Sequence, residues 1–180
     1  MSRVTTTTLP QPSAIHATLP GADFWDAYAA SDPAPAVSAL QAWLDLVART
    51  PRWTRRLMAL RNWLVRLVGL QDLGQLDGGL PAGRAEAARY RVGDRVGIFT
   101  SRHLDAHEVV MGQDDKHLDV QVSLCKREQD GRPVVVLGTV VHVHNTLGHA
   151  YMAVVKPFHR RIVRAMLARL PRTAAGHGAR

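Results

Sequence analysis

Residues 116–144, KHLDVQVSLCKREQDGRPVVVLGTVVHVH, consist of two valine-rich runs on either side of Asp130-Gly131. This dipeptide is favoured in two-residue hairpin turns, because both central residues of a type I′ turn need a positive φ. If the turn forms, Gln129 faces Arg132 and every other cross-strand pair follows from that one. The sequence therefore predicts a long antiparallel hairpin with a defined register.

The register sorts the hairpin side chains into two faces, because successive side chains of a strand point to opposite sides. A slip of one residue would mix the faces and place polar groups in the core, so their separation supports the register. The almost wholly apolar face pairs Leu118 with Val143, Val120 with Val141, Val122 with Thr139, and Leu124 with Leu137. The other face pairs His117 with His144, Asp119 with His142, Gln121 with Val140, Ser123 with Gly138, and Cys125 with Val136.

The residues before the hairpin predict one strand, two helices and two further strands. Strands are expected between residues 15 and 30, at 96–100 and at about 104–111, and the segment 71–93 is expected to be mostly loop. A first helix should start near Pro33 with its apolar side at Val37, Leu40, Leu44 and Val47. A second helix should start at Thr50-Pro51, with an apolar side made of Trp53, Leu57, Leu60, Leu64 and Leu67.

After Asn145 or Thr146, both good N-caps, the hydrophobic period becomes helical through to Leu170. Because the apolar stripe stays in phase across Pro157, we expect a kink at that residue, although two shorter helices would also fit. The stripe comprises Leu147, Tyr151, Val154, Val155, Phe158, Ile162, Met166 and Leu170. Together these elements predict an α+β fold in which an antiparallel sheet wraps a long, kinked C-terminal helix.

The chain has 180 residues, which is enough for one sizeable core, so we expect a single domain over residues 14–170. The Thr- and Pro-rich residues 1–13 and the tail 171–180 are expected to be disordered. Cys125 is the lone cysteine, so no internal disulfide can form, and a cytoplasmic protein is predicted. The apolar runs are interrupted by arginine well short of the roughly 20 residues that cross a bilayer, so no transmembrane segment is expected.

The net charge of +8 is concentrated after Asp130, which is the last acid. Such basic segments attract nucleic acid or anionic lipid, and they also occur as solvated helix faces. Weak association with anionic surfaces through the arginine-rich helices is therefore one hypothesis, and plain solvation is the alternative. The cations after Asp130 are Arg132, Lys156, Arg160, Arg161, Arg164, Arg169, Arg172 and Arg180.

The polar face of the hairpin carries the strongest candidates for chemistry. His117, Asp119, His142 and His144 share that face, and imidazole with carboxylate suits zinc, iron or nickel. Alternatively, Asp119 could orient His142 as a general base. The competing interpretation is that these are cross-strand polar pairs on the more exposed side of the sheet.

Other residues are weaker candidates for a functional site. If Asp114-Asp115 is also a two-residue turn, His107 lies on the apolar face opposite Val122, as a core residue or as one polar group in a pocket. Cys125 has no neighbouring feature that indicates a nucleophile. No dinucleotide, phosphate-loop, zinc-protease or serine-hydrolase motif is present, and no cofactor is predicted.

Three runs together resemble a known family. They are PRWTRRLMALRNWLVRLVGL (51–70), VVMGQDDKHLDVQVSL (109–124) and TVVHVHNTLGHAYMAVVKPFHRRIV (139–163). They resemble the bacterial domain-of-unknown-function family numbered 2867 over residues 14–170. This family has no established activity that the resemblance could carry over to the chain.

The order of strand, two helices, meander and long C-terminal helix is similar to the helix-grip arrangement of the START, Bet v 1 and SRPBCC superfamily. That analogy implies an apolar cavity between the sheet and the C-terminal helix, and fold alone does not fix function. The leading hypothesis is a binding protein for a hydrophobic small molecule, with an enzyme or a protein of anionic surfaces as alternatives. The expected cavity residues are Val109, Met111, Leu118, Val120, Val141, Val143, Tyr151, Val155, Phe158 and His107.

Overall fold

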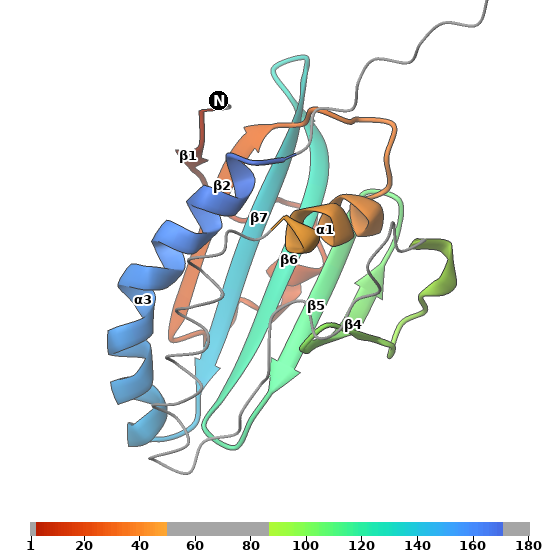
Figure 1. Cartoon of the computed structure of the whole chain (residues 1–180). Coiled ribbons are helices and arrows are strands. Elements are labelled where there is room, and N and C mark those ends of the chain that lie inside the picture. The colour runs from red at the N-terminus through yellow and green to blue at the C-terminus, as the bar shows by residue number, and fades with distance from the viewer. Residues whose placement is uncertain (1–2, 50–86, 171–180) are drawn as a thin grey trace, which may run out of the picture.

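The computed structural model describes residues 3–49 and 87–170, which form an α+β architecture (Figure 1). Its seven described strands make one open antiparallel sheet in the order β1-β2-β7-β6-β5-β4-β3. Of the described helices, α1 and α3 lie on the same side of this sheet (Figure 1). The elements are β1 (Thr5–Thr6), the 3-10 helix η1 (Ile15–Thr18), β2 (Phe24–Ser31), α1 (Ala39–Ala48), the 3-10 helix η2 (Ala87–Arg89), β3 (Arg95–Val96), β4 (Phe99–Leu104), β5 (Glu108–Asp114), β6 (Leu118–Gln129), β7 (Arg132–Val143) and α3 (Thr146–Leu167).

The central hairpin of β6 and β7 has the predicted register. Gln129 pairs with Arg132, and the ladder continues unbroken to Leu118 and Val143. Asp130 has φ 52° and Gly131 has φ 70°, as the primed turn requires. The prediction from the Asp-Gly dipeptide is confirmed.

The sheet has two faces, which we call the helix face and the far face. The helix face contacts α1 and α3 and carries the apolar hairpin residues, among them Leu124 and Val122 in the main core cluster. The far face carries the side chains that alternate with these, including Cys125 and Val140. The separation of the two faces that the sequence predicts is therefore present.

The chain after β2 enters α1 later than predicted, at Ala39. The Ser38 hydroxyl accepts a hydrogen bond from the amide of Gln41, so Ser38 is the N-cap. The expected start near Pro33 was wrong, because the carbonyls of this stretch bind a side chain of the sheet instead. The ammonium of Lys126 donates to the carbonyls of Ala34, Pro35 and Val37 and lies 3.2 Å from the Asp32 carboxylate.

The C-terminal helix α3 runs without a break through Pro157, so its predicted continuity is confirmed. Its N-cap is Asn145, whose side chain accepts from the amide of Gly148. Proline leaves the carbonyl of Ala153 without its usual intrahelical donor, and Ala153 is exposed, where water can take that place.

The buried side of α3 differs from the predicted stripe by one position. The fully buried residues are Gly148, Met152, Val163 and Leu167, whereas Phe158 of the predicted stripe is 42% exposed. Gly148 explains why the buried face is rotated by one residue from the predicted stripe. A residue without a side chain lets the helix backbone lie directly against the His117 carbonyl. The helix then turns the residues in line with Gly148 toward the sheet.

Residues 5–18, which we call the N-terminal strap, cross the far face, whereas the sequence predicted disorder up to residue 13. β1 pairs with β2, and the Thr7 amide donates to the Ala27 carbonyl at 3.0 Å. Leu9 and Ile15 are buried on the far face at 5% and 0% exposure. Composition suggested a solvated segment, but two apolar anchors are enough to hold it against the sheet.

The turn between β5 and β6 lies two residues later than the turn expected at Asp114-Asp115, with Lys116 and His117 as its central residues. Asp114 pairs with Asp119, and the Asp115 amide donates to the Leu118 carbonyl. In the observed pairing, His107 lies just before the first residue of β5, where it is exposed and does not face Val122. The expectation that His107 lies on the apolar face was therefore wrong.

Other expectations fall wholly or partly outside the described residues. The second helix expected from Thr50 and the tail 171–180 lie outside them. Most of the loop expected at 71–93 also lies outside them, and its described part includes η2 at residues 87–89. Among the described helices, none is both long and apolar enough to cross a membrane.

Candidate functional site

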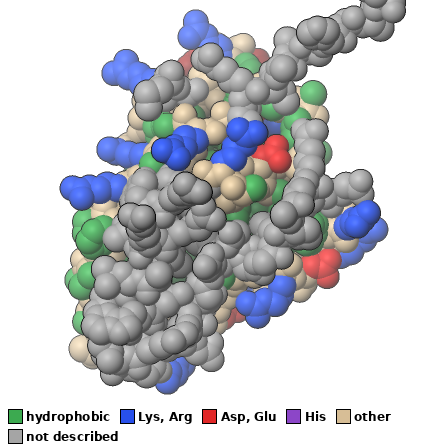
Figure 2. Space-filling view, viewed as in Figure 1, with side chains coloured by type: hydrophobic (Ala, Val, Ile, Leu, Met, Phe, Trp, Pro, Cys, Tyr) green, Lys and Arg blue, Asp and Glu red, His purple; other side chains and the backbone are tan. Residues whose placement is uncertain are grey.

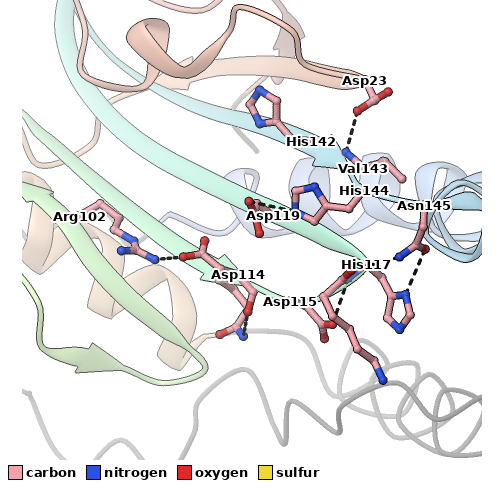
Figure 3. Close-up of polar contacts among 12 residues, drawn as sticks. Asp23, Arg102, Asp114, Asp115, His117, Asp119, His142, Val143, His144 and Asn145 are labelled. Carbon is pink, nitrogen blue, oxygen red and sulfur yellow. Dashed lines mark hydrogen bonds and ion pairs between the residues drawn. The ribbon is translucent and has the colours of Figure 1, made fainter.

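The far-face histidines lie near one end of the central hairpin, and each has a different partner (Figure 3). His144 Nε2 lies 3.1 Å from Asp119 Oδ2 in a half-exposed pair. His142 points away from this pair, and its Nε2 lies 3.2 Å from the carbonyl of Pro20. Asp119 therefore contacts His144, and not His142 as the general-base hypothesis requires.

His117 binds the N-cap residue of α3. Its Nδ1 donates to Asn145 Oδ1 at 3.1 Å, the same oxygen that caps the helix, while Asn145 Nδ2 donates to the Lys116 carbonyl at 3.1 Å. Its other ring nitrogen is buried without a hydrogen-bond partner among the described residues. This imidazole thus fastens the β5–β6 turn to the first turn of the helix.

The three imidazoles point in different directions (Figure 3). Within residues 3–49 and 87–170, no group of three or more His, Cys, Asp or Glu side chains is placed to hold a metal ion. The described geometry gives cross-strand polar contacts and a helix cap on this face. Metal binding by His117, Asp119, His142 and His144 remains a hypothesis from the sequence alone.

A polar cluster lies on the helix face, between the sheet and α3, where the surroundings are mainly apolar. We call Asp26 of β2, Thr139 of β7 and His159 of α3 the Asp26 cluster. His159 Nε2 lies 3.2 Å from Asp26 Oδ1 and 3.2 Å from Thr139 Oγ1. Asp26 and Thr139 are buried at 8% and 2% exposure. The second carboxylate oxygen, Asp26 Oδ2, is buried and has no hydrogen-bond partner among the described residues.

The geometry of the Asp26 cluster defines what it can bind. With Asp26 ionised, Nε2 of His159 carries the proton and shares it between Oδ1 and the threonine oxygen. Oδ2 then remains as a buried acceptor, and the Tyr28 hydroxyl is the neighbouring donor that interacts with the Asp26 carboxylate. An unpaired buried acceptor is unfavourable by about 1–3 kcal/mol, more when charged, so this oxygen calls for a donor.

Aromatic rings and cations surround the cluster. The Phe24 ring meets His159 edge to face at 5.9 Å between centroids. The Lys156 ammonium lies 5.2 Å from the centroid of Phe24, and the Arg164 guanidinium lies 5.1 Å from that of Tyr28. Burial raises the pKa of Tyr28 above its ordinary value, and the nearby negative charge of Asp26 raises it further. The tyrosine hydroxyl therefore stays protonated near the carboxylate.

The cavity residues predicted from the sequence fall into distinct groups. Those under α1 are fully buried, and those near the start of α3 surround Phe24 and Met152. Phe158 and His107 are exposed. The first group is Val109 and Met111; the second is Leu118, Val120, Val141, Val143 and Tyr151; Val155 is half-buried.

Two shallow pockets border the N-terminal strap on the far face. One measures about 320 Å³ and is lined by His107, Glu108 and Cys125, among others. The other measures about 460 Å³ and includes Trp25 and Arg127. Glu108 is already engaged, because its carboxylate accepts from the amides of Ala14 and Ile15. Glu108 therefore anchors the strap.

Cys125 is expected to react slowly with thiol reagents. Burial raises the pKa of its thiol to about 11, and the negative charge of Glu108 adds to the effect. Because the thiolate is the reactive form, modification by an aromatic disulfide at pH 8 should be far slower in the folded protein than in denaturant. Equal rates in the two states would show that the strap does not cover this thiol.

The sequence analysis did not identify Asp26, Thr139 and His159 as polar partners. A weak signal was present, because Asp26 interrupts an otherwise apolar and aromatic strand, FWDAYAA. Thr139 was placed on the correct face, as the one hydroxyl in an apolar set. Nothing local indicated that these two residues meet across β2 and β7.

A comparison with family models shows the family of the chain. Residues 18–166 match the model described as Protein of unknown function (DUF2867). The chain belongs to this family. The match to DUF2867 spans every element from β2 to most of α3, so it includes all of the Asp26 cluster. No curated protein and no solved structure matches the sequence.

Proposed function

We propose that this DUF2867 protein binds a small molecule between the sheet and α3, with Asp26 as its polar anchor. The molecule has an apolar body and one group that donates a hydrogen bond, such as a hydroxyl or an amine. The observation that carries the proposal is Asp26 Oδ2, a buried carboxylate oxygen without a partner among the described residues.

A carboxylate at this position is difficult to explain by stability alone. Removing an ion from water is unfavourable by several kcal/mol, and a single imidazole offsets only part of that. An apolar side chain of similar size would pack between Phe24 and Tyr28 at no such penalty. A residue that lowers stability and retains an unused acceptor is typical of a binding site.

The apolar body of the ligand would lie along the hairpin side of the helix face, next to Leu118 and Val141. These residues cluster with Phe24 and Met152, directly beside the Asp26 cluster. The helix-grip arrangement that the sequence resembles would place a ligand in the same region, between sheet and C-terminal helix. Small-molecule sites commonly combine apolar walls with a few polar groups that fix orientation.

Ligand binding can be tested with simple amphiphiles on the full chain. Long-chain alcohols and amines should raise the melting temperature, because a ligand that binds only the folded state stabilises it. An alkane of equal length should have little effect, since it offers nothing to Asp26 Oδ2. Native mass spectrometry of the same samples should show the bound mass.

Asp26→Leu should abolish the stabilisation by alcohols and amines while leaving the unliganded protein folded. The matched control is Asp119→Leu, which makes the same change at a half-exposed aspartate on the far face and should keep the response. An equal response in Asp26→Leu, or none from any amphiphile in the unsubstituted protein, would contradict the proposal.

A further inference from the structure

The outward side of α3 has an unusual composition for a helix at a protein surface. Ala150, Ala153, Val154, Pro157 and Phe158 are exposed along its first three turns and its middle, and Arg160, Arg161 and Arg164 are exposed after them. Val154 and Phe158 are 60% and 42% exposed. Residues 146–170 contain no acid at all. Exposed apolar residues beside arginines, without acids, are typical of helices that lie in a membrane interface.

We propose that this outward side of α3 docks on the surface of an anionic phospholipid bilayer. In Figure 2, Lys and Arg side chains gather above hydrophobic ones along the edge where Figure 1 places α3. The apolar residues would enter the headgroup region, and the arginines would contact lipid phosphates. The surface lies on the opposite side of α3 from the Asp26 cluster, so the proposal is independent of ligand binding.

Two of the cations on this helix are held in place by the sheet. Lys156 lies over the Phe24 ring, and Arg164 lies over the Tyr28 ring while donating to the Thr6 hydroxyl at 3.2 Å. Fixed cations lose little conformational freedom when an anion arrives. Within residues 3–49 and 87–170, Arg161 has no such contact, and its neighbour Phe158 is exposed. These two residues are therefore suited to direct contact with lipid.

Charge and apolar exposure together favour lipid over other occupants. Nucleic acid would use the arginines but would gain nothing from Val154 and Phe158. A second copy of the chain would bring two acid-free, cationic helices together, and like charges oppose that contact. An anionic bilayer satisfies both properties of the surface.

Vesicle sedimentation of the full chain tests the proposal. The protein should bind vesicles of phosphatidylcholine mixed with phosphatidylglycerol and not vesicles of phosphatidylcholine alone. Each unit of charge near the surface changes the partition coefficient by about five-fold, so Arg161→Glu should lower it about 30-fold. Phe158→Asp should lower it by about 10-fold or more. Binding should also weaken near 1 M salt, where the Debye length is about 3 Å.

Matched controls separate this surface from general charge and folding effects. Arg132→Glu makes the same charge change at the hairpin turn, and Val92→Asp replaces another exposed apolar residue, at 61% exposure. Both should bind like the unsubstituted protein. A protein that binds no anionic vesicles at low salt would overturn the proposal. Binding to duplex DNA that Phe158→Asp does not change would also overturn it. So would a protein that binds no vesicles but forms a dimer that Phe158→Asp disrupts.

Discussion

Lys126→Met should lower the free energy of unfolding by about 3–5 kcal/mol, the range typical of breaking a buried ion pair from one side. Lys126 and Asp32 are 7% and 8% exposed. Methionine fills a similar volume but leaves the Asp32 carboxylate buried without its cation. It also leaves three carbonyls of the segment before α1 without their shared donor. Urea unfolding followed by circular dichroism measures the change.

A double variant and a control at the neighbouring residue test whether the loss of stability comes from the buried charge. Asp32→Asn combined with Lys126→Met should recover part of the loss, because the uncompensated charge is gone. Arg127→Met alters the adjacent, exposed residue and should change stability by less than about 1 kcal/mol. A loss in Lys126→Met as small as that of Arg127→Met would mean that the ammonium is hydrated rather than bound to the segment.

Gly148→Ala should destabilise the protein by about 1–3 kcal/mol, although alanine is the better helix former. A Cβ at this position would lie 2.7 Å from Val143 Cγ1 and closer still to the His117 carbonyl oxygen. The carbonyl belongs to the backbone of a hydrogen-bonded turn and cannot rotate away. The first turn of α3 would therefore have to move off the sheet, with loss of burial at Met152.

Ala150→Gly in the same helix is the control for helix propensity. Ala150 is exposed, so the substitution should cost up to about 1 kcal/mol through backbone entropy alone. Thermal unfolding of both variants then compares the two effects in one helix. A melting temperature of Gly148→Ala above that of the unsubstituted protein would contradict the close packing of α3.

The central hairpin was predictable because its information is local. Asp130-Gly131 specifies the turn, and the alternation of side chains along β6 and β7 leaves one consistent register. The α+β architecture followed from the change of hydrophobic period after Asn145. By contrast, the Asp114-Asp115 dipeptide did not locate the next turn, which lies at Lys116-His117 and is held by hydrogen bonds of Asp115.

Long-range packing decided the features that the sequence did not predict. β2 pairs with β7 across more than a hundred residues of chain, so no turn chemistry sets the register that brings Asp26 opposite Thr139. The buried face of α3 depends on Gly148. Glycine has no apolar side chain, so a pattern of hydrophobic residues does not include it. The N-terminal strap is held by Leu9 and Ile15, and two apolar residues in a polar segment do not form a pattern that the sequence could show.

The described sheet ends in β1 on one side and β3 on the other, and each has only two residues. A long, flat edge would offer its free amides and carbonyls to a strand of another molecule. Here the longest strands, β6 and β7, are interior, so both edges of the valine-rich hairpin are paired with neighbouring strands of the same sheet. The hairpin therefore offers no open edge to a strand of another molecule.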